Sequence, residues 1–178
     1  MHVAKPLKLH TLEEFEQMTK EEHITYELID GIVMMSPRPA AKHQLTCGNL
    51  YAELRTTLRQ KNYNIIFEFD LLLEHNYLVP DLMIACEDKF EGNRYKKVPQ
   101  IIVEIISPSS ASRDYLVKRN KYEQLGIPEY WIVSPEEQCI DVLCFTDTSH
   151  TNYCVKDNPI LTSCSIPELT IDLNNVFE

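Results

Sequence analysis

The hydrophobic residues of the N-terminal third recur first at helical spacing and then in short strand-like runs. In residues 10–22 apolar positions follow Thr11 and Glu14, which have the spacing of a capping box, so this segment is expected to be a short surface helix. Two apolar runs in residues 24–37 meet at Asp30-Gly31, a dipeptide typical of tight hairpin turns. The chain is therefore predicted to begin with a helix and a β-hairpin.

The middle of the chain carries one long helical stripe and then three apolar strands. Residues 40–62 place their apolar side chains on one face, which predicts a long amphipathic helix. Strands rich in Ile, Leu, Val and Phe are expected at 64–73, 78–86 and 100–107. The last of these is almost continuously apolar, which is typical of a central strand covered on both faces.

A second helix and further strands complete the pattern. Residues 112–128 have a helical repeat that ends at Gly126, and strands are expected at 129–135 and 139–145, with a short strand or turn in the tail at 166–177. Helices interspersed with strands around an apolar middle strand favour an α/β fold, a mixed β-sheet flanked by helices, with the N-terminal β-hairpin attached. With no repeat or linker, residues 1–178 are expected to form one domain.

Composition narrows the class of protein. No apolar run is long enough to span a membrane and no signal-peptide core is present, so we expect a cytoplasmic protein without a membrane partner. Six cysteines occur singly, without a CxxC pair, and are expected to be buried free thiols. The net charge of −10 argues against a nucleic-acid coat protein. Basic residues concentrate at 89–97 and 113–121. These segments are either ordinary solvent-exposed charge clusters or a local basic face of an enzyme.

Two isolated carboxylates lie in the apolar strands. Asp81 follows Pro80, which cannot donate a ladder hydrogen bond, so Asp81 is expected at a strand margin. Glu104 alternates with Val103 and Ile105 and projects from one face of its strand. If the strands are neighbours, both acids reach one point, where a divalent cation would relieve their repulsion. We expect Mg²⁺, with Mn²⁺ as a second choice; alternatively, each acid faces solvent or pairs with a basic residue.

The helix after Glu104 offers a lysine to such a site. Lys118 recurs at helical spacing with Tyr122 and Leu125, so its ammonium can be directed toward the sheet. The alternative is a surface ion pair with Asp114, four residues earlier, worth only a few tenths of a kcal/mol. The sequence alone leaves both interpretations open.

Three segments carry a specific combination of motifs: "TYELIDGIVMMSPRPAAKHQ", "VPDLMIA" and "IIVEIISPSSASRDYLVKRNKYEQLGIPEYWIVSP". They resemble the small stand-alone restriction endonuclease family of bacterial genomes, within the PD-(D/E)xK nuclease superfamily. The resemblance covers nearly the whole chain, and its most specific part is the series E-I-I-S-P-S-S, D-x-x-x-K-x-x-x-Y and G-I-P-E-Y-W-I-V. It implies a restriction endonuclease-like core, metal-dependent hydrolysis of DNA, and a homodimer that straddles the duplex.

The resemblance also implies roles for single residues. Asp81 and Glu104 would bind Mg²⁺, with the main-chain carbonyl of Ile105 as a further candidate ligand. The superfamily's lysine belongs two residues after Glu104, where this chain has Ile106. The family supplies the lysine from the following helix, which makes Lys118 the candidate. A lysine there would orient the attacking water or neutralise developing charge.

Two further residues match family positions. By the resemblance, Glu27 would add a ligand or a water contact, and His43 would approach the scissile phosphate. The alternative for His43 is a hydrogen-bonded histidine at a helix start. Glu68 and Asp70 alternate with phenylalanines and are assigned to a solvent face, outside the site.

Two other functions compete with the endonuclease. One is a nuclease fold with weak or no catalysis that serves as a DNA-binding or protein-interaction module, which the net acidity and the missing in-line lysine favour. The other is a metal-dependent phosphohydrolase acting on nucleotides. A metal-dependent rise in thermal stability would argue against a degenerate site.

Overall fold

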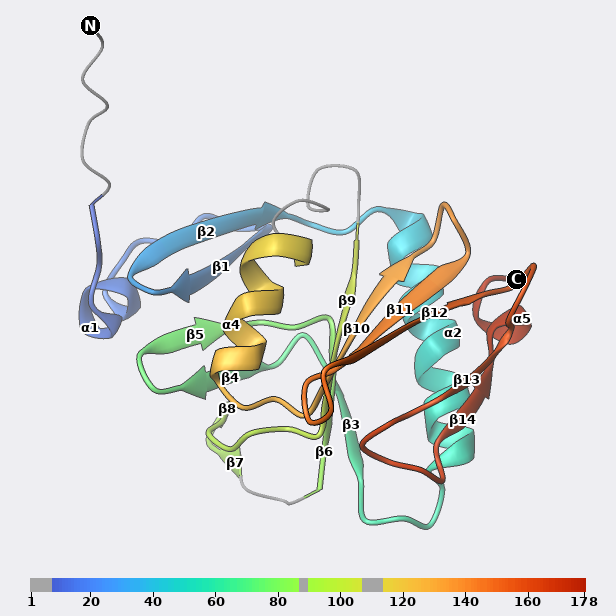
Figure 1. Cartoon of the computed structure of the whole chain (residues 1–178). Coiled ribbons are helices and arrows are strands. Elements are labelled where there is room, and N and C mark those ends of the chain that lie inside the picture. The colour runs from blue at the N-terminus through green and yellow to red at the C-terminus, as the bar shows by residue number, and fades with distance from the viewer. Residues whose placement is uncertain (1–7, 87–89, 107–113) are drawn as a thin grey trace, which may run out of the picture.

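The computed structural model describes residues 8–86, 90–106 and 114–178 (Figure 1). The elements follow along the chain in this order: α1 Leu12–Glu16, β1 Ile24–Ile29, β2 Ile32–Pro37, α2 Ala41–Thr57, β3 Asn64–Phe67, β4 Asp70–Leu73, β5 Asn76–Leu78, β6 Leu82–Ala85, β7 Phe90–Glu91, β8 Arg94–Tyr95, β9 Ile101–Ile105, the π-helical turn η1 Asp114–Lys118, α4 Arg119–Gln124, β10 Glu129–Ser134, β11 Cys139–Cys144, β12 Ser149–Cys154, β13 Ile160–Thr162, β14 Thr170–Asp172 and α5 Leu173–Val176.

In the described residues the strands form two mixed six-stranded sheets and one two-stranded sheet. The central sheet has the order β12-β11-β10-β9-β6-β3, in which β9 and β10 are parallel and the other neighbours are antiparallel. The second sheet has the order β2-β1-β5-β4-β8-β7. In Figure 1, α2 and α4 lie on opposite sides of the central sheet. The expected mixed sheet flanked by helices is confirmed.

Strand β9 is the centre of the molecule, and all five of its residues are buried. On one face, Leu50 and Leu54 of α2 share a hydrophobic core with Val103. On the other, Tyr122 of α4 shares a second core with Ile102. Because side chains alternate along a strand, the side chain of Glu104 is on the same face as that of Ile102, the face covered by α4.

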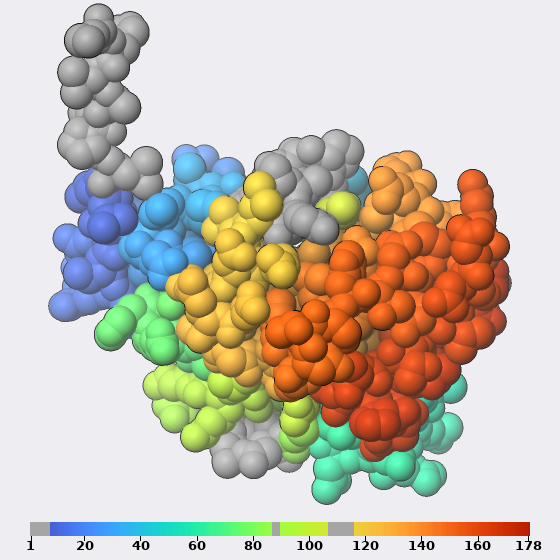
Figure 2. Space-filling view, in the orientation of Figure 1, coloured from blue at the N-terminus to red at the C-terminus, as the bar shows by residue number. Residues whose placement is uncertain are grey.

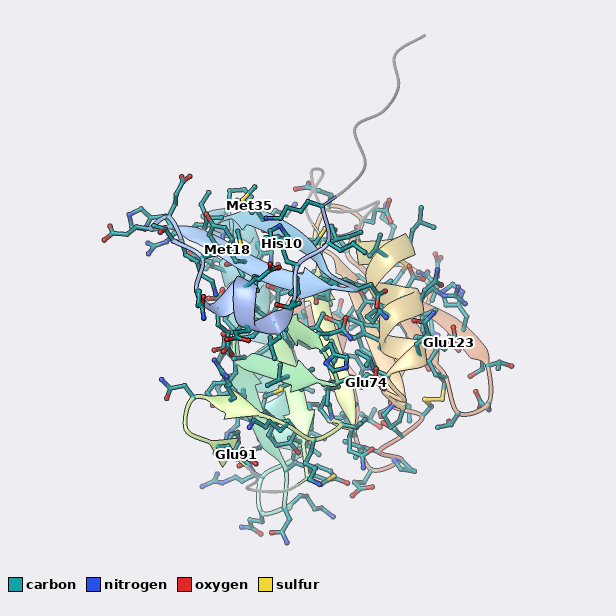
Figure 3. All side chains as sticks on the ribbon, turned by 90° about the vertical axis from the view of Figure 1, so that its left-hand side faces the viewer. His10, Met18, Met35, Glu74, Glu91 and Glu123 are labelled. Carbon is teal, nitrogen blue, oxygen red and sulfur yellow. A yellow bond between two sulfur atoms is a disulfide. The ribbon has the colours of Figure 1, made fainter. Side chains whose placement is uncertain are left out.

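The N-terminal helix and hairpin are confirmed, although α1 ends at Glu16 and does not continue through the predicted residues 17–22. Thr11 and Glu14 form both hydrogen bonds of a capping box at the start of α1. In the β1–β2 turn, Asp30 and Gly31 have φ of 50° and 79°, the left-handed conformations that a two-residue hairpin turn requires. Figure 3 views this side of the molecule, with His10, Met18 and Met35 around α1 and the hairpin.

The single strand expected at 64–73 is wrong. The chain breaks at Glu68, whose φ of 37° is left-handed, so β3 joins the central sheet and β4 joins the second sheet. Strand β5, which pairs with both β4 and β1, was not expected either. The apolar run has no glycine or proline to mark the break; only the pairing of its two halves with different partners reveals it.

The expectation of free thiols is wrong for four cysteines. Cys139 forms a disulfide with Cys154, and Cys144 forms one with Cys164; Cys47 and Cys86 are free. Cys139 and Cys154 lie directly opposite each other on β11 and β12. Spacing along the chain could not show this pairing, because β12 itself was not expected.

The C-terminal segment is attached to the central sheet by Glu129, a fully buried residue of β10. Its carboxylate accepts hydrogen bonds from Trp131 Nε1, from Ser163 Oγ, and from the main-chain amide and hydroxyl of Ser165. Four donors compensate for burying this charge. In Figure 2 the C-terminal residues, in red, cover much of the right-hand side of the molecule.

Candidate active site

Asp81 and Glu104 lie on neighbouring strands at the same level of the central sheet. In the antiparallel pair β6–β9, Leu82 is opposite Val103, so the next pair outward is Asp81 and Glu104. The Oδ2 atom of Asp81 accepts a hydrogen bond of 2.7 Å from the main-chain N–H of Ile105. The Asp81 carboxylate thus lies beside the residue that follows Glu104, where β6 begins.

His43 lies in the first turn of α2 and contacts the same aspartate. Its Nε2 atom is 3.1 Å from Asp81 Oδ2, and both side chains are largely buried. In the tautomer with the proton on Nε2, His43 donates to the carboxylate. Helix α2 has no side-chain cap at Ala40 and no acidic residue in its first turn, so the partial positive charge of its N-terminus is not neutralised there. Because His43 belongs to this first turn, its contact places the N-terminus of α2 near Asp81.

A buried ion cluster lies on the other side of Glu104. The Lys118 ammonium is 2.7 Å from Glu104 Oε1 and 3.0 Å from Glu27 Oε1, and all three residues are at most 4% exposed. The Tyr122 hydroxyl donates to Glu104 Oε1 at 2.6 Å, and the Val79 amide donates to Glu27 Oε1 at 3.0 Å. Residues from β1, β9, η1 and α4 therefore meet at one point, which joins the two large sheets.

Lys118 and Lys121 lie on the same helical segment but extend in different directions. Lys121 extends the other way, toward the hairpin turn, where its ammonium is 2.5 Å from Asp30 Oδ1 and 3.0 Å from Gln124 Oε1. Lys118 is the lysine that contacts Glu104. The side chain of Asp114, the alternative partner of Lys118, lies outside the described side chains.

Burial, together with the negative charge of the site, raises the pKa values of two nearby groups. Burial, with the carboxylates of Glu104 and Glu27 adding to it, raises the pKa of Tyr122 well above its ordinary value, so this hydroxyl stays protonated. Burial, followed by the charges of Asp81 and Glu68, raises the pKa of the Cys47 thiol to about 12. Cys47 is therefore a neutral packing residue at the edge of the site.

Glu68 lies closer to the site than expected. Its main-chain N–H donates to the carbonyl of Asp81 at 3.1 Å, and its side chain is exposed, as predicted. In the antiparallel β3–β6 pair, Phe67 is opposite Leu82, so the next residues along the two strands, Glu68 and Asp81, are neighbours. The predicted solvent face is thus confirmed for Glu68, whereas Asp70 is only partly exposed and its carboxylate accepts a hydrogen bond from Tyr77.

The basic segments do not form a continuous basic face in the described residues. Arg94 is 2.7 Å from Glu16, and Lys96 is 2.6 Å from Glu91. Two other residues of these segments, Lys89 and Arg113, lie outside the described residues. Arg94 and Lys96 are therefore partly neutralised by acidic neighbours.

By their chemistry, the carboxylates of Asp81 and Glu104 are ligands that a hard divalent cation prefers. The group has three carboxylates, those of Asp81, Glu104 and Glu27, and one ammonium, that of Lys118. In their usual ionised forms these side chains have a net charge of −2, which a divalent ion would balance. Within the described ranges, no three carboxylate, imidazole or thiol groups form a ready ligand set. Two carboxylates completed by main-chain, water or phosphate oxygens are the arrangement that Mg²⁺ commonly uses.

In the part of the chain that the structure describes, none of the helices combines the length and the apolar character needed to cross a lipid bilayer.

Comparisons with known proteins agree with this architecture. A crystal structure from Anabaena variabilis ATCC 29413, described as a putative nuclease belonging to DUF820, has 20% sequence identity and a TM-score of 0.79, covering 94% of this chain and 97% of that chain. At this identity the likeness concerns the fold, and it confirms the expected nuclease-like α/β fold. No curated protein matches the chain. The model of the Uma2 family, described as "Putative restriction endonuclease", matches residues 12–174, so the chain belongs to this family.

Proposed function

We propose that the protein is an endonuclease that hydrolyses phosphodiester bonds of DNA with Mg²⁺, or with Mn²⁺ in its place. The observation that supports this most directly is the adjacency of Asp81, which immediately precedes β6, and Glu104 of β9, with a lysine buried against Glu104. Membership of a restriction endonuclease family supports the reaction class. The metal and the DNA substrate are part of the proposal.

Asp81 and Glu104 would hold the ion. When bound, a divalent ion activates a water molecule and neutralises charge on the phosphate. Lys118 fixes the Glu104 carboxylate and places a positive charge beside it, which would stabilise negative charge developing on the phosphoryl oxygens. Glu27 in turn holds Lys118. His43 orients Asp81 and, at the positive end of α2, would face the incoming phosphate.

We also propose that the working form is a homodimer. Each chain carries one candidate site, and the two strands of a DNA duplex are related by approximate two-fold symmetry. A symmetric dimer would present one site to each strand.

The test is DNA cleavage by the purified full chain. We expect weak nicking or cleavage of supercoiled and linear DNA with Mg²⁺ or Mn²⁺, because the net charge of −10 opposes approach to DNA. Removal of the metal with EDTA should abolish the activity, and Mg²⁺ added in excess of the chelator should restore it. Cleavage that is insensitive to EDTA would contradict the proposal.

The protein donors already bound to the carboxylates favour one alternative, a fold that binds DNA or protein without catalysis. Asp81 and Glu104 each accept hydrogen bonds from the chain itself. DNA binding with no metal-dependent cleavage and no metal-dependent stabilisation would support this alternative. Hydrolysis of free nucleotides with DNA left intact would instead indicate a phosphohydrolase.

A further inference from the structure

Tyr122 shares its acceptor atom with Lys118. The Tyr122 hydroxyl is 2.6 Å and the Lys118 ammonium 2.7 Å from the same oxygen, Glu104 Oε1. The two residues are four positions apart, which places them one above the other on the inner face of η1 and α4. Glu123, the next residue, projects outward from α4 (Figure 3). The helix therefore presents two donors of different charge to one carboxylate oxygen.

The Tyr122 ring is held rigidly. It is fully buried, and it packs edge to face on Tyr130 with ring centroids 5.0 Å apart. Ile102 and Ile132, from the two parallel strands, belong to the same core. A ring fixed on its faces and edges places its hydroxyl at one point, so the hydrogen bond constrains Glu104.

We propose that Tyr122 is a positioning residue of the site: its hydroxyl, together with the Lys118 ammonium, fixes the orientation in which the Glu104 carboxylate meets a divalent cation. This inference rests on the proposed function, because it assigns Glu104 as a ligand. An ammonium alone attracts the carboxylate without fixing its plane, whereas a second donor on a rigid ring restrains its rotation. Residues that orient a metal ligand typically change metal affinity or activity by about 10–100-fold when they are removed.

The test is Tyr122→Phe, which removes the hydroxyl and keeps the ring. We expect the Kd for Mn²⁺ alone, measured by isothermal titration calorimetry, to rise about 10-fold, with the far-UV circular dichroism unchanged. The matched control is Tyr77→Phe, which also removes a buried tyrosine hydroxyl bonded to a carboxylate, that of Asp70 on β4. This control should leave the Mn²⁺ affinity unchanged.

A double variant separates positioning from a general loss of stability. In a Glu104→Gln background, Tyr122→Phe should not weaken Mn²⁺ binding further, because its partner is no longer the ligand. A wild-type protein that binds Mn²⁺, with Tyr122→Phe binding it equally well, would overturn the inference about Tyr122. A wild-type protein that binds no Mn²⁺ would instead overturn the proposed function.

Discussion

Asp81→Asn is expected to lower metal-dependent DNA cleavage by about 10³-fold, or about 4 kcal/mol in the activation free energy. Asparagine keeps the size of the side chain and an oxygen that can accept from the Ile105 amide, so the fold should persist. It removes the negative charge that would hold the cation. Initial rates of plasmid nicking with Mg²⁺, and thermal unfolding of both proteins, measure the two effects.

The chain offers a matched control for this variant. Asp141 is 2.9 Å from His150 Nε2 on the β11–β12 pair, an aspartate–histidine pair outside the candidate site. Asp141→Asn should therefore retain cleavage at the wild-type rate. Equal, metal-independent cleavage by wild type and Asp81→Asn would identify the activity as a contaminant.

Lys118→Met is expected to abolish cleavage and to destabilise the protein by about 3–5 kcal/mol, because it leaves two buried carboxylates without their shared cation. The double variant Glu27→Gln/Lys118→Met removes one of these charges and should recover much of the stability. Cleavage should stay absent in the double variant. Urea unfolding and nicking rates distinguish a catalytic loss from a folding loss.

Lys121→Met is the control for Lys118. It removes the nearby ion pair with Asp30, which lies at the hairpin turn, and should leave cleavage close to wild type. The assignment of Lys118 would be contradicted by full activity in a folded Lys118→Met protein, or by loss of activity in Lys121→Met alone.

Local patterns predicted the elements whose signals lie within one segment. The capping box of α1, the Asp30-Gly31 turn and the apolar stripe of α2 depend on neighbours a few residues apart, and the structure contains all three. The nearly continuous apolar run of β9 likewise indicated a strand buried on both faces.

Features set by long-range pairing could not be predicted from the sequence. The break at Glu68 and the cystine between Cys139 and Cys154 both depend on which strands become neighbours. The same holds for the contact of Lys118 with Glu27, which are 91 positions apart. Helical spacing indicated that Lys118 points toward the sheet, but it could not identify the two carboxylates that Lys118 contacts.

The central claim is that Asp81 and Glu104 hold one divalent cation, and crystals soaked in Mn²⁺ test it most directly. Anomalous scattering should show one Mn²⁺ peak with carboxylate oxygens of both residues at roughly 2.0–2.6 Å. A well-ordered site with no peak, or with Mn²⁺ bound elsewhere while Glu104 remains bonded only to Lys118 and Tyr122, would contradict the claim.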